Sequence, residues 1–287
     1  MSAELVIDIR DLKKIYGEKS AVAGVNLSVR KGEIFALLGP NGAGKTTTIE
    51  ILEGYRKKTS GEISVLGVDP SAHISKESER KWREKIGIVL QTAGDAADLS
   101  VEETVNHYAK YYSRARNSEQ TIDEVGLSDK RQAKIRTLSG GQRRRLDVAL
   151  GIIGNPELLF LDEPTTGFDP EARRAFWELI RKLRDEGTTI LLTTHYLDEA
   201  EELADRVAVI TQGKIMEVAS PKTLGGRDHA MTEISFLRHG VREVIATATP
   251  TSEIARLERE FGGEIPELSV KRPTLEEIYL RMIGSVQ

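Results

Sequence analysis

The chain has 287 residues and a formal net charge of −4, with 39% hydrophobic and 30% charged residues, as in ordinary soluble globular proteins. The negative charge argues against a generic nucleic-acid coat, and the absence of cysteine excludes disulfides and thiolate metal sites. The longest uncharged stretches fall well short of the roughly 20 apolar residues of a membrane-spanning helix, and Met1–Glu4 shows no secretory signal.

Strand and helix patterns alternate along most of the chain. Alternating polarity at Leu5–Ile9 and Gly24–Val29 predicts two half-buried strands. Continuous apolar runs of strand length then predict strands buried on both faces, at Ile34–Leu38, Ile86–Leu90, Leu158–Leu161 and Thr189–Leu192. Helices are predicted between them, at 46–53, 100–136 and 170–185. A late strand pair is predicted around Gln212–Gly213.

This order predicts an α/β fold with a mainly parallel sheet and an antiparallel β portion at the start. The stretch 92–150 interrupts the alternation and is predicted to be a helical subdomain, with Val101, Val105, Tyr108 and Tyr112 on one face. The alternation ends near residue 220. We therefore expect one domain over 1–220 and a small α+β accessory domain over 221–287, with a helix at Thr274–Met282.

A glycine-rich loop follows the strand Ile34–Leu38 directly. Its sequence, Gly39–Thr46, matches the G-x-x-x-x-G-K-[ST] pattern in full and precedes a predicted helix. In this arrangement the backbone N–H groups of residues 42–46 point at phosphate oxygens, at the positive end of the helix. Lys45 then bridges the β- and γ-phosphates, and the Thr46 hydroxyl binds Mg²⁺. The loop predicts a nucleoside triphosphate site rather than a chance glycine turn.

Two adjacent acids end the apolar run Leu158–Leu161. Neighbouring side chains of a strand point to opposite faces, so Asp162 and Glu163 are expected to have different roles. Asp162 is predicted to face Mg²⁺, and Glu163 to polarise an attacking water. The alternative is a pair of surface acids before Pro164.

Two further side chains follow predicted strands. His195 comes after the strand at 189–194, on the sheet edge where such folds bind ligands, although a lone histidine is more often structural. Gln91 follows the strand Ile86–Leu90, and an amide at a strand end is usually only a turn residue. Both are weaker candidates than the glycine-rich loop.

A second glycine-rich helix start lies at Leu138–Gln142, with the sequence Leu-Ser-Gly-Gly-Gln. Ser139 and Gln142 have the spacing of a capping box, so one interpretation is a simple helix start. A cap does not require Gly140 and Gly141, and each glycine costs about 1 kcal/mol of helix stability relative to alanine. Bare backbone allows an anion to approach the N–H groups. We favour a second phosphate-facing surface, which could close around nucleotide with a copy of the chain.

Basic residues cluster at Arg143–Arg145 and along Lys130–Arg136. We interpret both clusters mainly as solvated helix faces, with contact to a partner or to phosphate as the alternative.

Taken together, these residues resemble the nucleotide-binding domain of ABC ATPases over about residues 4–220. Five motifs occur in the order of that family: Walker A at Gly39–Thr46, the Q-loop at Gln91, the signature at Leu138–Gln142, Walker B at Leu158–Glu163 and the switch histidine at His195. The family also has a D-loop, here Thr165–Asp169. Phe168 departs from the more common leucine but is still apolar.

The resemblance implies a role for each site residue. Glu163 is the general base, and Lys45 and His195 are the other catalytic residues. The metal ligands are Thr46, Gln91 and Asp162, and Tyr16 stacks on adenine. The expected ATP contacts are Tyr16, Gly39, Pro40, Asn41, Gly42, Ala43, Gly44, Lys45, Thr46, Thr47 and Gln91, with Ser139, Gly140, Gly141 and Gln142 from a second subunit.

The resemblance also implies function and partners. The chain is expected to bind ATP and Mg²⁺, to hydrolyse ATP, to pair as a homodimer and to power a transmembrane permease from the cytoplasmic face of the membrane, without binding nucleic acid. Pro273–Leu280 is similar to the ending of daunorubicin-resistance-type exporter ATPases, which favours export of a drug, lipid or polysaccharide-like cargo. The alternative is a soluble ABC ATPase acting on ribosomes or DNA.

Overall fold

The computed structural model describes residues 4–72, 75–89 and 98–284. Two compact units make up the chain, Met1–Val218 and Ala219–Gln287. Each unit has its own sheet and its own buried apolar residues, and each is described separately below.

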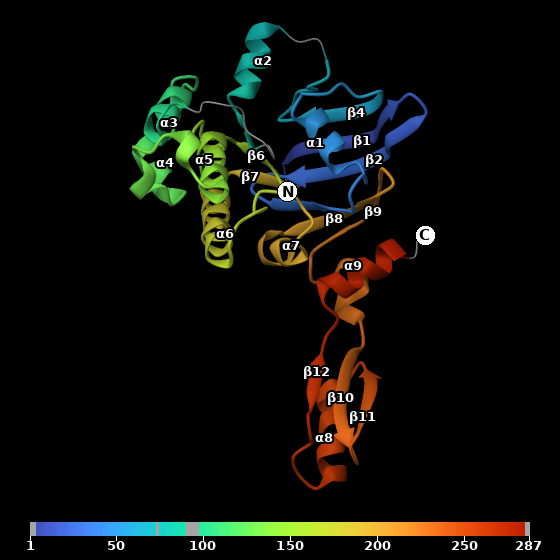
Figure 1. Ribbon diagram of the computed structural model, residues 1–287. Helices are drawn as coiled ribbons and strands as arrows, with labels where there is room; N and C mark the ends of the chain where they lie inside the picture. Colours follow the sequence, from blue (N-terminus) through green and yellow to red (C-terminus); the bar gives the residue numbers. More distant parts are fainter. Residues whose placement is uncertain (1–3, 73–74, 90–97, 285–287) are drawn as a thin grey trace. The chain divides into compact units, whose positions relative to one another are not determined.

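The first unit is built on a six-stranded sheet with the order β5-β6-β7-β3-β8-β9 (Figure 1). Its first five members in that order pair in parallel, and the turn Gln212–Gly213 joins β8 to β9. The four apolar runs predicted as buried strands form four consecutive strands of this sheet, β5, β6, β7 and β3, which confirms the α/β fold. The strands are β3 (Ile34–Leu38), β5 (Ile86–Val89), β6 (Leu158–Asp162), β7 (Thr189–Thr194), β8 (Arg206–Thr211) and β9 (Lys214–Ala219).

A separate antiparallel sheet with the order β2-β1-β4 forms the start of the chain. The two strands predicted here are longer in the structure than the stretches of alternating polarity that predicted them. β1 (Leu5–Tyr16) and β2 (Lys19–Arg30) continue to pair across several register shifts. β4 (Ser60–Val65) pairs with the other edge of β1 and was not predicted. The apolar side chains of this sheet pack with those of β3 and β6 in one core.

Helices accompany the sheets of this unit. α1 follows the glycine-rich loop, and α6 covers the range predicted for it, residues 170–185. The backbones of Gly87 on β5 and Gly151 on α5 approach closely, and a Cβ on Gly87 would come 2.1 Å from the Gly151 carbonyl oxygen. This close approach brings α5 directly against β5. The helices are α1 (Lys45–Leu52), α2 (Lys76–Arg83), α5 (Gly140–Ile152), α6 (Pro170–Asp185) and α7 (Leu197–Leu203).

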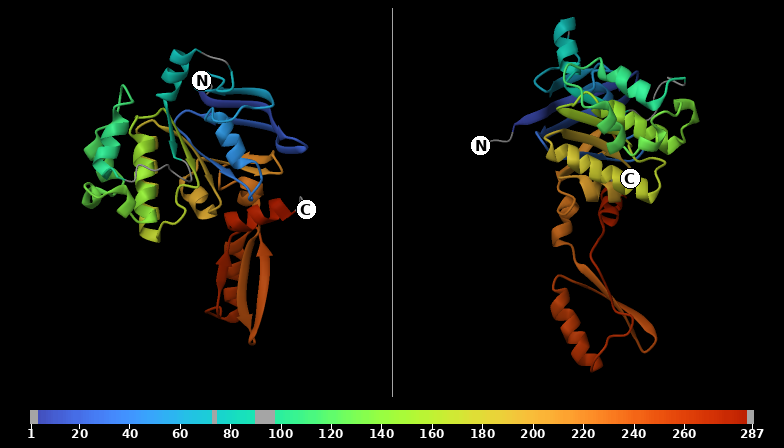
Figure 2. Two further views of the ribbon diagram at one scale, coloured as in Figure 1. Left: turned by 45° about the horizontal axis from the view of Figure 1, so that its top comes forward. Right: turned by 90° about the vertical axis from the view of Figure 1, so that its left-hand side faces the viewer.

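Residues 101–152 form a group of helices on the side of the central sheet away from β1, β2 and β4 (Figures 1 and 2). They include α3 (Val101–Ala109), α4 (Ser118–Glu124) and two short 3₁₀ turns, Ser128–Lys130 and Ile135–Thr137, before α5. Of the residues predicted to share one face, Val101 and Val105 are buried. Tyr108 is 40% exposed, because α3 ends at Ala109 and the ring packs against His107 and Tyr111 instead of the core.

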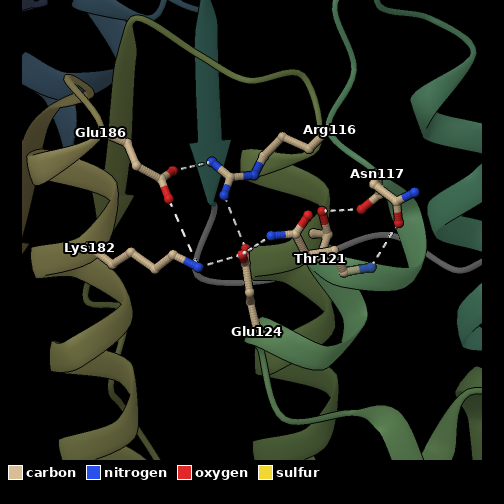
Figure 3. A network of polar contacts seen from close by, with 7 residues as sticks. Arg116, Asn117, Thr121, Glu124, Lys182 and Glu186 are labelled. Carbon is tan, nitrogen blue, oxygen red and sulfur yellow. Dashed lines mark hydrogen bonds and ion pairs between the residues drawn. The ribbon is translucent and has the colours of Figure 1, made fainter.

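A charged network ties α4 to the end of α6 (Figure 3). Arg116 donates to Glu124 at 3.1 Å and to Glu186 at 2.8 Å, and Lys182 donates to the other Glu124 oxygen at 2.7 Å. Burial by itself raises the pKa of Glu124, but its hydrogen bonds and the two cations outweigh burial and lower it. Glu124 is therefore held as a carboxylate that anchors α4 on α6.

The second unit is a small α+β structure. Its antiparallel sheet has the order β11-β10-β12, and α8 packs on it through Leu257, against Ile234 and Phe236 (Figure 2). Thr274 caps the last helix by accepting from the N–H of Glu277, and the predicted terminal helix is present. The elements are a 3₁₀ segment (Leu224–His229), β10 (Thr232–Arg238), β11 (Val241–Thr247), α8 (Pro250–Phe261), β12 (Ser269–Lys271) and α9 (Leu275–Gly284).

Candidate functional site

Three predicted site segments follow the carboxyl ends of neighbouring strands. β6, β7 and β3 are consecutive in the sheet and parallel, with Asp162 opposite Thr193 and Leu38 opposite Thr194. The Asp162–Glu163 pair, His195 and the loop that begins at Gly39 therefore lie at one edge, as ligand sites do in open parallel sheets. Gln91 would follow β5, the next strand over, but it lies outside the described residues.

The glycine-rich loop leads straight into α1. Gly44, the residue before the helix, has φ 106°, and a Cβ there would come 2.5 Å from the carbonyl oxygen of Ala21. Only glycine meets both demands, so the start of α1 can lie directly against β2. The first-turn N–H groups of α1 have no partner within the helix, which makes this end suited to an anion.

Lys45 lies over the loop that it belongs to. Its side chain is 6% exposed, and its Nζ donates to the carbonyl oxygens of Gly39 at 2.7 Å and Pro40 at 3.2 Å. Burial lowers the pKa of Lys45, and the nearby carboxylates of Glu163 and Asp162 oppose that effect. The ammonium is thus positioned between the loop and the two acids, where a phosphate chain would bring further negative charge.

The two adjacent acids differ in backbone conformation. β6 ends at Asp162, and Glu163 has left the extended region, with φ 46°. Strand alternation, on which the prediction of two roles was based, therefore does not apply to Glu163. The Asp162 carboxylate accepts from the Thr193 hydroxyl, whereas the Glu163 backbone N–H donates to the carbonyl and hydroxyl oxygens of Thr193. Thr193 holds both residues.

His195 and Glu163 lie side by side. His195 Nδ1 is 3.2 Å from Glu163 Oε1, and the exposed fractions of the two side chains are 45% and 16%. The imidazole also leans against the Tyr196 ring, with centroids 4.1 Å apart. The structure therefore brings together a carboxylate that can accept a proton and an imidazole that can orient it.

The predicted metal ligands suit Mg²⁺ better than a metal ion whose ligands all come from protein side chains. The described residues contain no group of three or more His, Asp or Glu side chains that could hold a metal ion. Mg²⁺ commonly takes one or two protein oxygens and completes its shell with water and substrate phosphates. The exposed Thr46 hydroxyl and the half-buried Asp162 carboxylate are donors of that kind.

A third acid, Glu53, is buried near Asp162 at the end of α1. It is 7% exposed, and burial, followed by the charges of Asp162 and Glu50, raises its pKa to about 7. The protonated form is favoured in the folded chain. Its contribution to stability is therefore complete below the ordinary value of 4.5 and is lost as the pH rises through about 7.

We expect Glu53→Gln to stabilise the first unit by about 2–3 kcal/mol more at pH 8 than at pH 5, because the amide never ionises. The measurement is denaturant unfolding followed by tryptophan fluorescence, since both tryptophans, Trp82 and Trp177, lie in that unit. Glu62→Gln, on the exposed part of β4, is the control. Parallel stability curves for wild type and Glu53→Gln would contradict the burial argument.

The segment 139–142 forms the capping box that its spacing allows. The Gln142 N–H donates to Ser139 Oγ at 3.3 Å, and the Ser139 N–H donates to Gln142 Oε1 at 3.0 Å. Neither glycine is explained by this motif. A Cβ would meet nothing within 4 Å at Gly140 and would only touch the Gly167 carbonyl at Gly141, and neither residue has positive φ. The bare backbone there serves no packing need of the described chain.

This segment is positioned by a helix rather than by a strand end. A small pocket of about 170 Å³ is lined by Ser139, Gly141 and Gln142 of this segment, together with Gly167, Phe168 and Asp169. Asp169 is also the cap of α6, because its Oδ1 accepts from the Ala172 N–H at 2.8 Å. The two helix starts, of α5 and α6, therefore meet at one surface.

Tyr16 lies at the end of β1 and is 41% exposed. Its ring has two cationic neighbours, Lys14 Nζ at 4.9 Å and Arg56 at 6.0 Å from the centroid. An exposed ring flanked by cations is suited to stacking with a planar group that carries phosphates.

Sequence reasoning missed two residues at the site. Thr193, which holds Asp162 and Glu163, looked like an ordinary strand residue. Arg144 was interpreted as part of a solvated helix face, and for this residue the interpretation was wrong: it is 7% exposed and donates to backbone carbonyls after β6. The signal available was helical period, because Arg144 lies one turn before Val148, which is buried on the same face of α5.

Comparisons with known proteins agree with this geometry. The sequence model of the ABC transporter family matches residues 22–166. The linearmycin resistance ATP-binding protein of Bacillus subtilis (strain 168) is 35% identical over 248 residues, covering 85% of this chain and 78% of that protein. A daunorubicin resistance ATP-binding protein of Streptomyces coeruleorubidus is 35% identical, and the match covers 98% of this chain and 97% of that protein. Nod factor export ATP-binding protein I of Burkholderia orbicola (strain AU 1054) is 39% identical, and the match covers 76% of this chain and 72% of that protein.

Solved structures of ATP-binding cassettes also match this chain. A dimeric post-hydrolysis state of an ATP-binding cassette, bound to ADP and phosphate, matches with a TM-score of 0.68 and 25% identity, covering 75% of this chain and 98% of that one. An ATP-binding subunit of an ABC transporter matches with a TM-score of 0.72 over 97% of this chain and 99% of that one. At 22% identity, the second match shows a shared fold.

Proposed function

Since the chain belongs to the ABC transporter family and is an ATPase, we propose that it works as a homodimer that powers a separate membrane-spanning permease of the export type. The observation that carries this proposal is the pairing of two phosphate-facing surfaces in one chain. One is the loop 39–46 beside Asp162, Glu163 and His195, and the other is the segment 139–142 on α5.

In this proposal each chain binds ATP through its own loop. The N–H groups of residues 42–46 and the Lys45 ammonium bind the phosphates, and Tyr16 stacks on the base. Thr46 and Asp162, together with Gln91, would hold Mg²⁺, which supplies charge neutralisation at the phosphates. The donor types and the helix start described above support this assignment.

Hydrolysis then depends on Glu163 and His195. Water attacks the γ-phosphorus as Glu163 accepts its proton, the bond to the β-phosphate oxygen breaks, and ADP and phosphate are formed. His195, 3.2 Å from Glu163, orients the carboxylate and faces the transferring phosphate. The 139–142 segment of the second chain contributes N–H groups to the same γ-phosphate, so ATP closes the dimer and its hydrolysis reopens it. The solved dimer of a related cassette supports this arrangement.

We infer that residues 1–220 are the ATP-binding domain, that 92–150 are its helical subdomain, and that 221–287 are an accessory domain. The division of the chain into Met1–Val218 and Ala219–Gln287 supports these boundaries.

We place the permease contact on the helical subdomain, around 92–115. The described part of this region presents an exposed aromatic group on and after α3, in which Tyr111 is 64% exposed, Tyr108 is 40% exposed, and His107 packs between them. Exposed aromatic groups of this kind are typical of protein interfaces. No helix in the described residues could itself span a bilayer. Because its relatives are named as ATP-binding proteins of drug resistance and of export, we place the chain on the cytoplasmic face of the membrane, held by its partner.

Relatives named for drug resistance and for Nod factor export support an exporter of amphipathic cargo, such as a drug, a lipid or a polysaccharide-like molecule. They do not favour the alternative of a soluble ATPase acting on ribosomes or DNA. The test is affinity purification of the tagged full-length chain from detergent-solubilised membranes, with Tyr108→Ser/Tyr111→Ser as a matched variant. We expect a multi-spanning protein to co-purify with wild type and to be lost with the variant. Recovery of ribosomes in place of a membrane protein would refute the proposal.

A further inference from the structure

The turn that carries Glu163 is strained. Glu163 is not glycine, yet its φ of 46° lies in the left-handed region, immediately before Pro164. A residue held there is strained, and the conformation persists only when the surrounding structure determines it. Thr193 holds the N–H side of this turn. The carbonyl side is held by a residue from another element.

That residue is Arg144, on α5. Its Nε donates to the Pro164 carbonyl at 3.0 Å, and one Nη donates to the carbonyls of Asp162 at 2.7 Å and Glu163 at 3.2 Å. One guanidinium thus binds three successive carbonyls of the strained turn. With 7% of its surface exposed, the side chain is enclosed by the structure it holds.

The chemistry of the contact requires arginine. The guanidinium presents five N–H donors in a fixed plane, whereas a lysine ammonium is a compact point charge. A buried cation is costly unless it is paired, and here the carboxylates of Asp147 and Asp162 act on Arg144 as neighbouring opposite charges. The site is therefore built for a cation in this orientation.

The same residue is joined rigidly to the segment 139–142. Gly140 and Arg144 are one turn apart on α5, whose first turn is fixed by the capping box between Ser139 and Gln142. A shift of the α5 start is passed by this single turn to the guanidinium, and from there to the backbone of Glu163.

We propose that Arg144 is a positioning residue that couples the two ATP sites of the dimer. The coupling rests on the proposed function, in which 139–142 of one chain meets the nucleotide bound by the other. ATP in the partner's loop binds the capped start of α5 and sets its position, α5 sets Arg144, and Arg144 sets the turn that aims Glu163 of its own chain. Hydrolysis at each site then depends on occupancy of the other.

The test compares Arg144→Lys and Arg144→Gln with wild type in the full-length chain, measuring ATPase rate against ATP concentration and nucleotide binding separately. Arg143→Gln is the matched control, because Arg143 is its neighbour on α5 but donates to Ile135 instead. We expect kcat to fall about 10- to 100-fold in both Arg144 variants, because misplacement of a reacting group by about 1 Å has effects of that size. KM should stay within about threefold, since the binding loop is untouched.

The shape of the curve is the second readout. The wild-type rate should be sigmoidal in ATP, and the Arg144 variants should become hyperbolic, because the link between the sites is lost. Arg144→Lys keeps the cation and carries the test if Arg144→Gln does not fold. The inference is overturned if the Arg144 variants have the kcat of wild type, or if the wild-type curve is hyperbolic. It is also overturned if kcat falls only together with a higher KM and a lower melting temperature. Wild type that binds ATP but never hydrolyses it refutes the proposed function instead.

Discussion

Glu163→Gln is expected to bind ATP with unchanged affinity and to hydrolyse it about 100- to 10,000-fold more slowly than wild type. The amide keeps the size of the side chain but cannot accept the proton of the attacking water. The strained backbone at Glu163, held by Thr193 and Arg144, does not depend on the side-chain charge, so the fold should be preserved.

The same variant should accumulate as an ATP-bound dimer, because the step that reopens the dimer is blocked. Size-exclusion chromatography with and without ATP measures this, alongside phosphate release. Glu178→Gln is the control, since it removes one negative charge from an exposed position of α6. Normal turnover by Glu163→Gln would exclude Glu163 as the base.

Ser139→Arg is expected to abolish hydrolysis, by about 100-fold or more, while monomeric chains still bind ATP. The guanidinium would occupy the surface where, in the proposed dimer, the bare backbone of Gly140 and Gly141 approaches the partner's phosphate. The loop 39–46 lies on a different element and keeps its nucleotide contacts.

A second substitution separates this effect from helix capping. Ser139→Asp keeps a side-chain acceptor for the Gln142 N–H but places a negative charge toward the phosphate. It should melt like wild type and still lose activity. Placed in the Glu163→Gln background, Ser139→Arg should prevent the ATP-dependent dimer. A double variant that still dimerises would show that the segment is only a helix start.

Local patterns were sufficient for much of the fold. The continuous apolar runs predicted β3, β6 and β7 closely, because strands covered on both faces leave no position for a polar side chain. Helical spacing did not determine side-chain burial, which depends on what another element packs against the side chain. Tyr108 shares the helical spacing of Val105, yet α3 ends before its ring can reach the core.

The Arg143–Arg145 cluster shows the same limit of local sequence patterns at the functional site. Three consecutive arginines look alike in sequence, but only Arg144 points from α5 toward the turn after β6. Its partners are backbone carbonyls, which carry no sequence signal. The left-handed backbone of Glu163 is equally invisible, because glutamate rarely adopts it and only its surroundings impose it.

The sequence by itself determined which chemical groups this protein has: a phosphate-binding loop, two acids and a histidine at strand ends, and a glycine-rich helix start. These depend on residue types at short spacing, where backbone geometry is set locally. Only the tertiary structure decided how they act together. The sheet order placed β6, β7 and β3 side by side, the contact between His195 and Glu163 followed from it, and α5 brought Arg144 onto the turn that holds Glu163. Such contacts join residues far apart in the chain, so packing determines them.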